Sequence, residues 1–363
     1  GAFGTGLTTG TDNVAIGENA GDALTSGSDN TFVGDEAGGA TTTGANNIAI
    51  GSAALDGNTT ASDNIAIGIN ALGASNTSAN NVAIGSGAMD ANTGGSGVAI
   101  GKDALGANTT GGSNTAVGYV ALTANTTGSG NVAVGAGALD AATTANNNTA
   151  VGADSLSAAT TGHSNTAVGK EAGEALTTGV STVFIGSGAG EAATTGDYNV
   201  AVGSEALTAL TTASNNTAVG YAALTAITTG DRSVAVGTNA ADAIVSGGRN
   251  NAIGYNALGA DTLGSRAVAL GYGALQTQNF TTATDNYNVG IGYNAGGAIT
   301  TGTLNTAVGG LALNTNTTGA DNTAVGYSAL YDNTTGARNT ALGTSAGANL
   351  TTGDDNTAIG RMA

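Results

Sequence analysis

The sequence contains no cysteine, no proline and no tryptophan, and only 4% of its 363 residues are aromatic and 9% charged. Without cysteine, a disulfide framework and a thiolate metal site are excluded. A zinc site would have to combine the one histidine, His163, with carboxylates. We therefore expect no metal and no cofactor, and a fold unlike an ordinary globular domain, where about 25% of residues are charged.

Basic residues are also scarce. Seven lysines and arginines face 25 acidic residues, which leaves a net charge of −18. Such a chain repels a phosphate backbone, so we expect no nucleic-acid partner. No apolar run approaches the roughly 18 residues of a transmembrane helix, so we expect no membrane insertion. The chain begins with Gly1 and shows no signal peptide, and we expect an excerpt or a processed product.

A short apolar segment, such as Asn114-Thr115-Ala116-Val117-Gly118, recurs 21 times along the sequence. Its glycine, here called position 0, returns with a spacing of 17 in 18 of 20 steps. The step from Gly85 to Gly101 is shorter by one, and the step from Gly271 to Gly292 is longer by four. We therefore expect residues 1–363 to form one continuous repeat domain, with no separate anchor, cap or tip domain.

The repeat keeps its residue types. Position −1 is Val, Ile or Leu in all 21 copies, position −2 is Ala in 18, position −4 is Asn in 17 and position +3 is Ala in 20. A 17-residue unit cannot bury a core alone, but it can stack on its neighbours. It is too short for a helix pair. The pattern predicts an all-β parallel β-solenoid, or β-roll, of about 21 coils, one per repeat.

Within each coil, the Val, Ile and Thr residues before the glycine predict a short strand. We expect a second strand over the Ala-Leu pair at positions +3 and +4. The Thr-Thr-Gly segment has turn composition, with its glycine free to take positive φ. In a solenoid each position stacks on itself, so the asparagines at position −4 should form a hydrogen-bonded ladder.

Position +4 is Leu in most copies and Gly in others. Where it is Gly, a large residue often follows at position +7, which indicates a shared interior in which lost volume is restored. This holds for Gly21 with Leu24, Gly173 with Leu176, Gly296 with Ile299 and Gly347 with Leu350. It fails for Gly38 with Thr41 and for Gly190 with Ala193.

The predicted strand is restricted on both faces, because side chains alternate along it. Thr115 and Val117 lie on one face and Ala116 on the other, and neither position varies as a solvent-facing position does. We expect one face inside the coil and the other against another chain, as in a closed homotrimer. The alternative is a monomeric solenoid whose alanines form a flat outer face.

Two segments carry a resemblance to known families. Asn81-Val82-Ala83-Ile84-Gly85 resembles the S-V-A-I-G segment of trimeric autotransporter adhesin heads, which are parallel β-rolls wound as trimers. Asn322 to Leu330, closed by Thr334-Thr335-Gly336, is similar to repeats of phage tail fibres and related bacterial surface proteins. The 17-residue unit is longer than the adhesin-head repeat. The resemblance implies a structural and adhesive protein, extracellular, in a virion tail fibre or on a bacterial surface.

Few residues are candidates for chemistry. His163 lies in a turn, where a solvated role is expected, and the acidic residues keep no single position. We therefore expect no enzyme. Arg232, Arg249 and Arg266 are separated by one repeat each and share one position in three coils. They are a candidate strip for phosphate or an acidic sugar, or plain surface charge.

Tyr255, Tyr272 and Tyr293 follow the glycine in three successive coils. They are either a platform for the sugar rings of a cell-surface glycan or a stabilising ladder. The 21-residue step, with Gln276, Gln278, Asn279 and Phe280, should project as a loop.

Three function classes follow: a fibre that spaces a binding tip from a surface, an adhesin that binds glycans along its length, and an ice-binding solenoid that uses the stacked threonine pairs. A head-to-tail filament subunit is a further form of the first.

Overall fold

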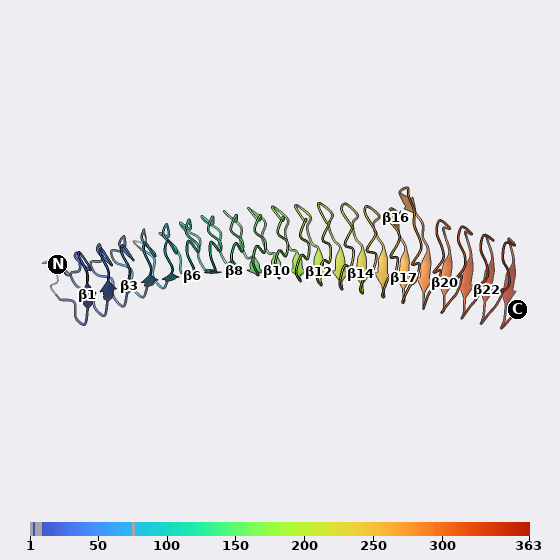
Figure 1. The fold of residues 1–363 in the computed structure, drawn as a ribbon, viewed down its shortest axis with the longest axis horizontal. Coiled ribbons are helices and arrows are strands. Elements are labelled where there is room, and N and C mark those ends of the chain that lie inside the picture. Colours follow the sequence, from blue (N-terminus) through green and yellow to red (C-terminus); the bar gives the residue numbers. More distant parts are fainter. Residues whose placement is uncertain (1–2, 4–8, 75–76) are drawn as a thin grey trace. The chain divides into compact units, whose positions relative to one another are not determined.

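The structure, a computed structural model, describes residues 3, 9–74 and 77–363. The chain divides into two compact units, Gly1–Ser181 and Thr182–Ala363, each described by itself. Each unit is a parallel β-solenoid in which one short strand per coil pairs with the strands of the coils beside it (Figure 1). The all-β solenoid predicted from the repeat is confirmed, with about 20 turns of about 17 residues.

The described residues of the first unit form ten strands. They are β1 (Val14–Ile16), β2 (Thr31–Val33), β3 (Ile48–Ile50), β4 (Ile65–Ile67), β5 (Val82–Ile84), β6 (Gly97–Ile100), β7 (Asn114–Val117), β8 (Val132–Val134), β9 (Thr149–Val151) and β10 (Thr166–Val168).

The second unit repeats this arrangement and adds a separate pair of two-residue strands. Its strands are β11 (Val183–Ile185), β12 (Val200–Val202), β13 (Thr217–Val219), β14 (Val234–Val236), β15 (Asn251–Ile253), β16 (Gly264–Ser265), β17 (Val268–Leu270), β18 (Thr284–Asp285), β19 (Val289–Ile291), β20 (Thr306–Val308), β21 (Thr323–Val325), β22 (Thr340–Leu342) and β23 (Thr357–Ile359).

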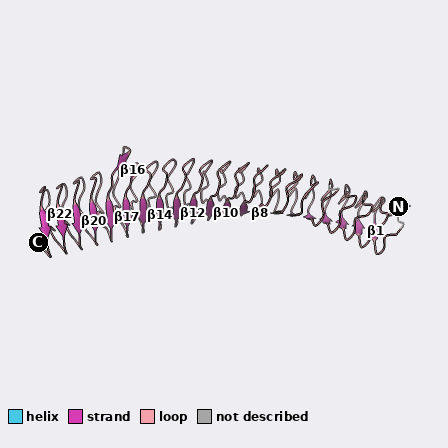
Figure 2. Ribbon diagram, turned by 180° about the vertical axis from the view of Figure 1, so that it is seen from behind, coloured by secondary structure: helices cyan, strands magenta, loops and turns pink. Residues whose placement is uncertain are grey.

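Within each unit, strands pair in parallel and residue for residue. Ile48, Ala49 and Ile50 of β3 lie beside Ile65, Ala66 and Ile67 of β4, so equal repeat positions stack on one another. The loops, which Figure 2 shows as the larger part of every coil, are also hydrogen-bonded between coils. The amide of Thr42, for example, donates to the carbonyl of Thr59 at 2.8 Å. This regular pairing satisfies backbone groups that a loop would otherwise leave to water.

The predicted second strand over the Ala-Leu pair is wrong, because that segment is a turn. The leucine at position +4 takes a left-handed backbone, with φ of 55° at Leu55 and 53° at Leu122. This conformation costs an L-residue about 1–2 kcal/mol. Both leucine side chains are fully buried, and the amide of Leu55 donates to the carbonyl of Ala71 at 2.9 Å, which offset that cost.

The glycine of the Thr-Thr-Gly segment is needed for a different reason from the one predicted. Gly44 does not have positive φ; instead, a Cβ added there would collide with the carbonyl oxygen of Ala61 in the next coil. The glycine at position 0 meets both constraints, since Gly51 has a φ of +134° and a Cβ on it would collide with the carbonyl of Gly68. The close contact between neighbouring coils therefore requires glycine at both positions.

The core is made of alanines and leucines. Ala116 at position −2, Ala121 at position +3 and Leu122 at position +4 are all 0% exposed. The strand alanines therefore point into the coil, and the alternative of a flat outer alanine face is wrong. The small alanine at position −2 leaves room for the leucine of the same coil, which keeps the cross-section narrow.

The volume compensation inferred from the sequence is present at Gly296 and Gly347, whereas the nearest side chain at Gly21 is Phe32 and not Leu24. A Cβ on Gly347 would lie 3.2 Å from Cδ1 of Leu350, so the larger side chain at position +7 fills the space. The two pairs that failed the rule have another partner. A Cβ on Gly38 would lie 2.6 Å from the ring of Phe32, and one on Gly190 would lie 2.7 Å from the ring of Phe184. In these two coils a phenylalanine at position −2 replaces the leucine.

The asparagine ladder is confirmed. The Nδ2 of Asn47 donates to Oδ1 of Asn30 at 3.1 Å and to the carbonyl of Ala61 at 3.0 Å. Its own Oδ1 accepts from the backbone amide of Asn64 at 3.1 Å. The three side chains are fully buried. Each asparagine thus joins the strand to the Thr-Thr-Gly turn of the next coil.

Candidate interaction surfaces

The outward side of each sheet is aliphatic. The side chains at positions −3 and −1 of the strands point away from the alanine core, and we call these two positions the aliphatic face. Ile50 is 39% exposed, Ile253 41% and Leu342 50%. No described residue at position −1 is buried.

The aliphatic face also lacks charge. Position −3 holds Val, Ile, Thr and, once, Asn251, and position −1 holds only Val, Ile and Leu. In a chain with a net charge of −18, both positions are free of ionisable groups in every repeat. Contiguous exposed apolar surface of more than a few hundred Å² marks an interaction site. The sequence pattern indicates that this face is restricted but not that it is the outer one.

The three candidate tyrosines form a stacked ladder. The rings of Tyr255 and Tyr272 are 5.1 Å apart and 18° from parallel, and those of Tyr272 and Tyr293 are 5.5 Å apart and 20° from parallel. Their exposed fractions are 45%, 52% and 57%. Because neighbouring rings cover each other's faces, a sugar ring can stack only at an end of the ladder. The glycan role of these residues stays a prediction.

The three candidate arginines lie at one exposed corner of their coils, where φ is 58° at Arg232, 60° at Arg249 and 67° at Arg266. Nη1 of Arg232 lies 3.4 Å from Oδ2 of Asp231. Arg249 makes no ion pair with any of the described residues. Arg232 is thus paired with a carboxylate, as is Arg266, whose pair is described next. The role of the three arginines in binding an anion stays a prediction.

Arg266 is held by two groups of the 21-residue step. Its Nε lies 2.9 Å from Oδ1 of Asp285 in an ion pair that is not an aligned hydrogen bond. Its guanidinium lies 5.3 Å from the ring centre of Tyr287. A cation over an aromatic face adds about 0.5–1 kcal/mol at an exposed site.

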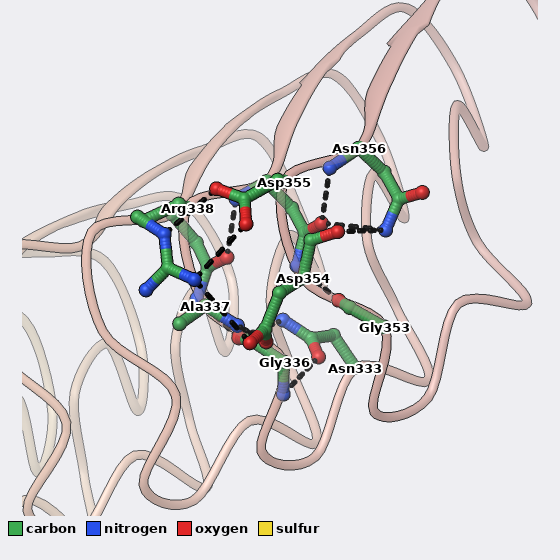
Figure 3. A network of polar contacts seen from close by, with 10 residues as sticks. Asn333, Gly336, Ala337, Arg338, Gly353, Asp354, Asp355 and Asn356 are labelled. Atoms are coloured by element: carbon green, nitrogen blue, oxygen red, sulfur yellow. Dashed lines mark hydrogen bonds and ion pairs between the residues drawn. The ribbon is translucent and has the colours of Figure 1, made fainter.

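A fourth arginine occupies the same corner and was missed by the sequence analysis. Arg338 contacts Asp355 through two hydrogen bonds, Nε to Oδ1 at 2.7 Å and Nη2 to Oδ2 at 3.0 Å (Figure 3). Its Nη2 also lies 3.4 Å from Oδ2 of Asp354. The Arg338 guanidinium lowers the pKa of the Asp355 carboxyl. The separation of Arg338 and Asp355 by one repeat was the signal that could have found the pair.

The 21-residue step does project, but not through the residues expected. The projecting part lies near β16, whose residues pair with Thr284–Asp285 of β18 (Figure 1). Gln278 is 0% and Phe280 5% exposed, so both lie inside the solenoid. The expectation that they belong to the loop is therefore wrong.

The buried Gln278 side chain is hydrogen-bonded to a buried carboxylate, that of Asp261. Its Nε2 donates to Oδ2 of Asp261 at 2.7 Å, and its Oε1 accepts from Nδ2 of Asn288 at 2.8 Å. The amides of Gly264 and Phe280 donate to Oδ1 of Asp261 at 3.0 and 3.1 Å. Burial nevertheless raises the pKa of the Asp261 carboxyl above its ordinary value.

The remaining candidates give no reactive constellation. His163 is exposed, and its Nδ1 lies 3.4 Å from Oγ of Ser164. Among the residues that the structure describes, no group of three or more His, Cys, Asp or Glu side chains could hold a metal ion. The same residues include no helix with the length and apolar character needed to span a bilayer.

The stacked threonine pairs are partly engaged within the fold. Oγ1 of Thr42 donates to the carbonyl of Thr59 at 3.0 Å, and Oγ1 of Thr317 donates to that of Thr334 at 3.0 Å. In these two pairs the first threonine is therefore a ladder residue, and the second, Thr43 or Thr318, is exposed.

The geometry defines a β-solenoid repeat protein with an exposed aliphatic face. No protein-family model matches the chain, and no curated protein matches it.

Proposed function

We propose that the protein is a structural segment of an extracellular fibre, of the kind found in virion tail fibres or on bacterial surfaces, and that it assembles as a homotrimer through the aliphatic face. The observation that carries this proposal is the charge-free outer face of each sheet, which has an aliphatic side chain at position −1 of every coil. Coils joined by strand pairing, asparagine ladders and turn hydrogen bonds make a stiff spacer, and the protein has no catalytic role.

The size of the aliphatic face supports an interface between chains. Ten strands about 4.8 Å apart, each about 10 Å long, give a face of roughly 480 Å² per unit. In a closed trimer three such faces turn toward one axis and together cover on the order of 1,400 Å² per unit, which is within the standard size of a specific interface. A second copy is the natural partner, because it presents the same uncharged surface.

The absence of native cysteine allows a direct test. Val219→Cys places a thiol on the aliphatic face, and Thr212→Cys places one on the exposed Thr211-Thr212-Ala213 turn. Under native conditions we expect a maleimide to label Thr212→Cys at least tenfold faster than Val219→Cys. Equal labelling of the two variants in folded protein would contradict assembly through this face.

Ice binding is the second candidate, and a specific observation favours it. Threonines at position −3 and aliphatic residues at position −1 are in register over β20–β23, in a regular array that faces outward. An ice-recrystallisation assay separates the two candidates. Inhibition by a monomer would support ice binding, and no inhibition together with a trimeric mass would support the fibre.

A further inference from the structure

The tyrosines at position +1 of the second unit are interrupted at one coil by a glycine. In chain order this position holds Tyr255, Tyr272, Tyr293, Gly310 and Tyr327. Tyr293 is 57% and Tyr327 58% exposed. The stacked ladder stops at Tyr293, and the next ring stands two coils further along.

The interruption leaves a space of one ring. The stacked tyrosines are 5.1 and 5.5 Å apart, so two coils separate the rings of Tyr293 and Tyr327 by roughly 10 Å. A six-membered ring placed midway lies about 5 Å from each tyrosine, within the usual distance for packing on an aromatic face. Gly310 forms the floor, and Cδ2 and Cε2 of Tyr327 lie 3.5 and 3.8 Å from the place that its Cβ would occupy.

The groups around this slot are uncharged. The neighbouring residues Val308 and Leu311 are aliphatic, and Asn294 and Ser328 follow the two tyrosines. A charged ligand would find no counter-ion among them. The two phenolic hydroxyls stand at the exposed rim, where they can exchange hydrogen bonds with hydroxyl groups of a ligand.

We propose that the slot between Tyr293 and Tyr327, above Gly310, binds one neutral pyranose ring of a carbohydrate. The apolar C–H faces of the sugar pack on the two tyrosine rings, and its hydroxyls point to the rim and to water. The inference deepens the attachment part of the proposed function by naming a ligand class and a site. The slot borders the aliphatic face at Val308 of position −1, so sugar binding and assembly have to be measured separately.

The chain contains its own comparison. Tyr221 and Tyr255 also stand two coils apart, but the residue between them is Thr238, which carries a side chain where Gly310 has none. Gly310 does not have positive φ, and a Cβ there meets its nearest neighbour at 3.5 Å, an ordinary contact. Gly310→Thr therefore closes the slot without straining the fold, and Thr238→Gly opens a second one.

The test uses the full chain and saturation-transfer NMR with methyl β-glucopyranoside and methyl β-galactopyranoside as probes. We expect binding of at least one glycoside to the wild type, at least a fivefold loss in Gly310→Thr, and twice the number of sites in Thr238→Gly. Sedimentation of the same samples reports assembly separately, so that loss of sugar binding at unchanged mass leaves the fibre proposal standing.

Three outcomes would overturn the proposal. One is no glycoside binding to the wild type at tens of millimolar. The second is equal binding to the wild type and Gly310→Thr. The third is binding of p-cresol but of neither glycoside, which would make the slot a site for an aromatic side chain.

Discussion

The ring of Phe184 occupies the space that Gly190 leaves open in the same coil, so closely that a Cβ on Gly190 would lie 2.7 Å from the ring. In most coils the same two positions are an alanine and a leucine, as in Ala116 and Leu122. Phe-Gly and Ala-Leu are therefore two solutions to one packing problem, and exchanging them tests the core directly.

Phe184→Ala should lower the free energy of unfolding by about 3–5 kcal/mol, because it leaves a cavity. Gly190→Leu should be at least as damaging, because the new side chain meets the phenylalanine ring. The double variant restores the Ala-Leu pair and should lie within about 1.5 kcal/mol of the wild type. Urea unfolding of the four proteins measures the coupling, and additive losses would contradict this packing.

The buried asparagine ladder should contribute strongly to the free energy of unfolding. Asn131→Ala removes the acceptor of the Asn148 amide and the donor to the carbonyl of Ala145, at 3.0 and 2.8 Å. Each orphaned buried group costs about 1–3 kcal/mol, so we expect a loss of about 2–4 kcal/mol. The exposed Thr127→Ala in the adjoining turn is the matched control, and thermal unfolding compares them. Equal stability of the two variants would show that the ladder is dispensable.

Asp261 predicts a dependence of stability on pH. Burial raises the pKa of its carboxyl in the folded state. The folded state then holds the proton more tightly than the unfolded state. The stability contribution is therefore complete below the ordinary pKa of 3.8 and is lost as pH rises through the raised value.

Asp261→Asn should remove the contribution of this carboxyl to the pH dependence of the free energy of unfolding, because asparagine does not titrate. The fold should accept asparagine there, since it fills position +7 in other coils, as at Asn108 and Asn125. Other aspartates with pKa values raised by burial remain in the variant, so the readout is the difference between the two proteins from pH 3 to pH 8. We expect Asp261→Asn to gain stability relative to the wild type as pH rises. Parallel pH profiles would contradict a raised pKa at Asp261.

Breaking the Arg338–Asp355 pair should shift the pKa of the Asp355 carboxyl but change the free energy of unfolding little, because both side chains are exposed. Arg338→Gln should return the pKa of the Asp355 carboxyl toward its ordinary value, since the guanidinium lowers it. NMR titration of the Asp355 carboxyl carbon measures this, with Arg232→Gln as a distant control that should leave it unchanged. An unchanged Asp355 titration in Arg338→Gln would show that the pair does not form in solution.

The 17-residue spacing was sufficient to predict the coils, the strand before each glycine and the asparagine ladder, because stacked positions must match. It could not decide which side of the strand faces inward, since Ala116 and Val117 are both apolar. The turn at Leu122 could not be predicted from the sequence either, because leucine rarely adopts the left-handed backbone conformation and the composition there favours a strand. The Tyr ladder was predictable from spacing, whereas the slot at Gly310 depends on the ring distances.

The central claim is that the aliphatic face is covered by further copies of the chain. Sedimentation equilibrium in dilute solution tests it most directly. We expect about three times the chain mass of 34.0 kDa, and a return to 34.0 kDa when Val134→Lys and Val219→Lys place charges on that face. The matched variant Thr127→Lys with Thr212→Lys should keep the wild-type mass. A wild-type mass of 34.0 kDa would contradict the claim and leave a monomer with an exposed aliphatic face.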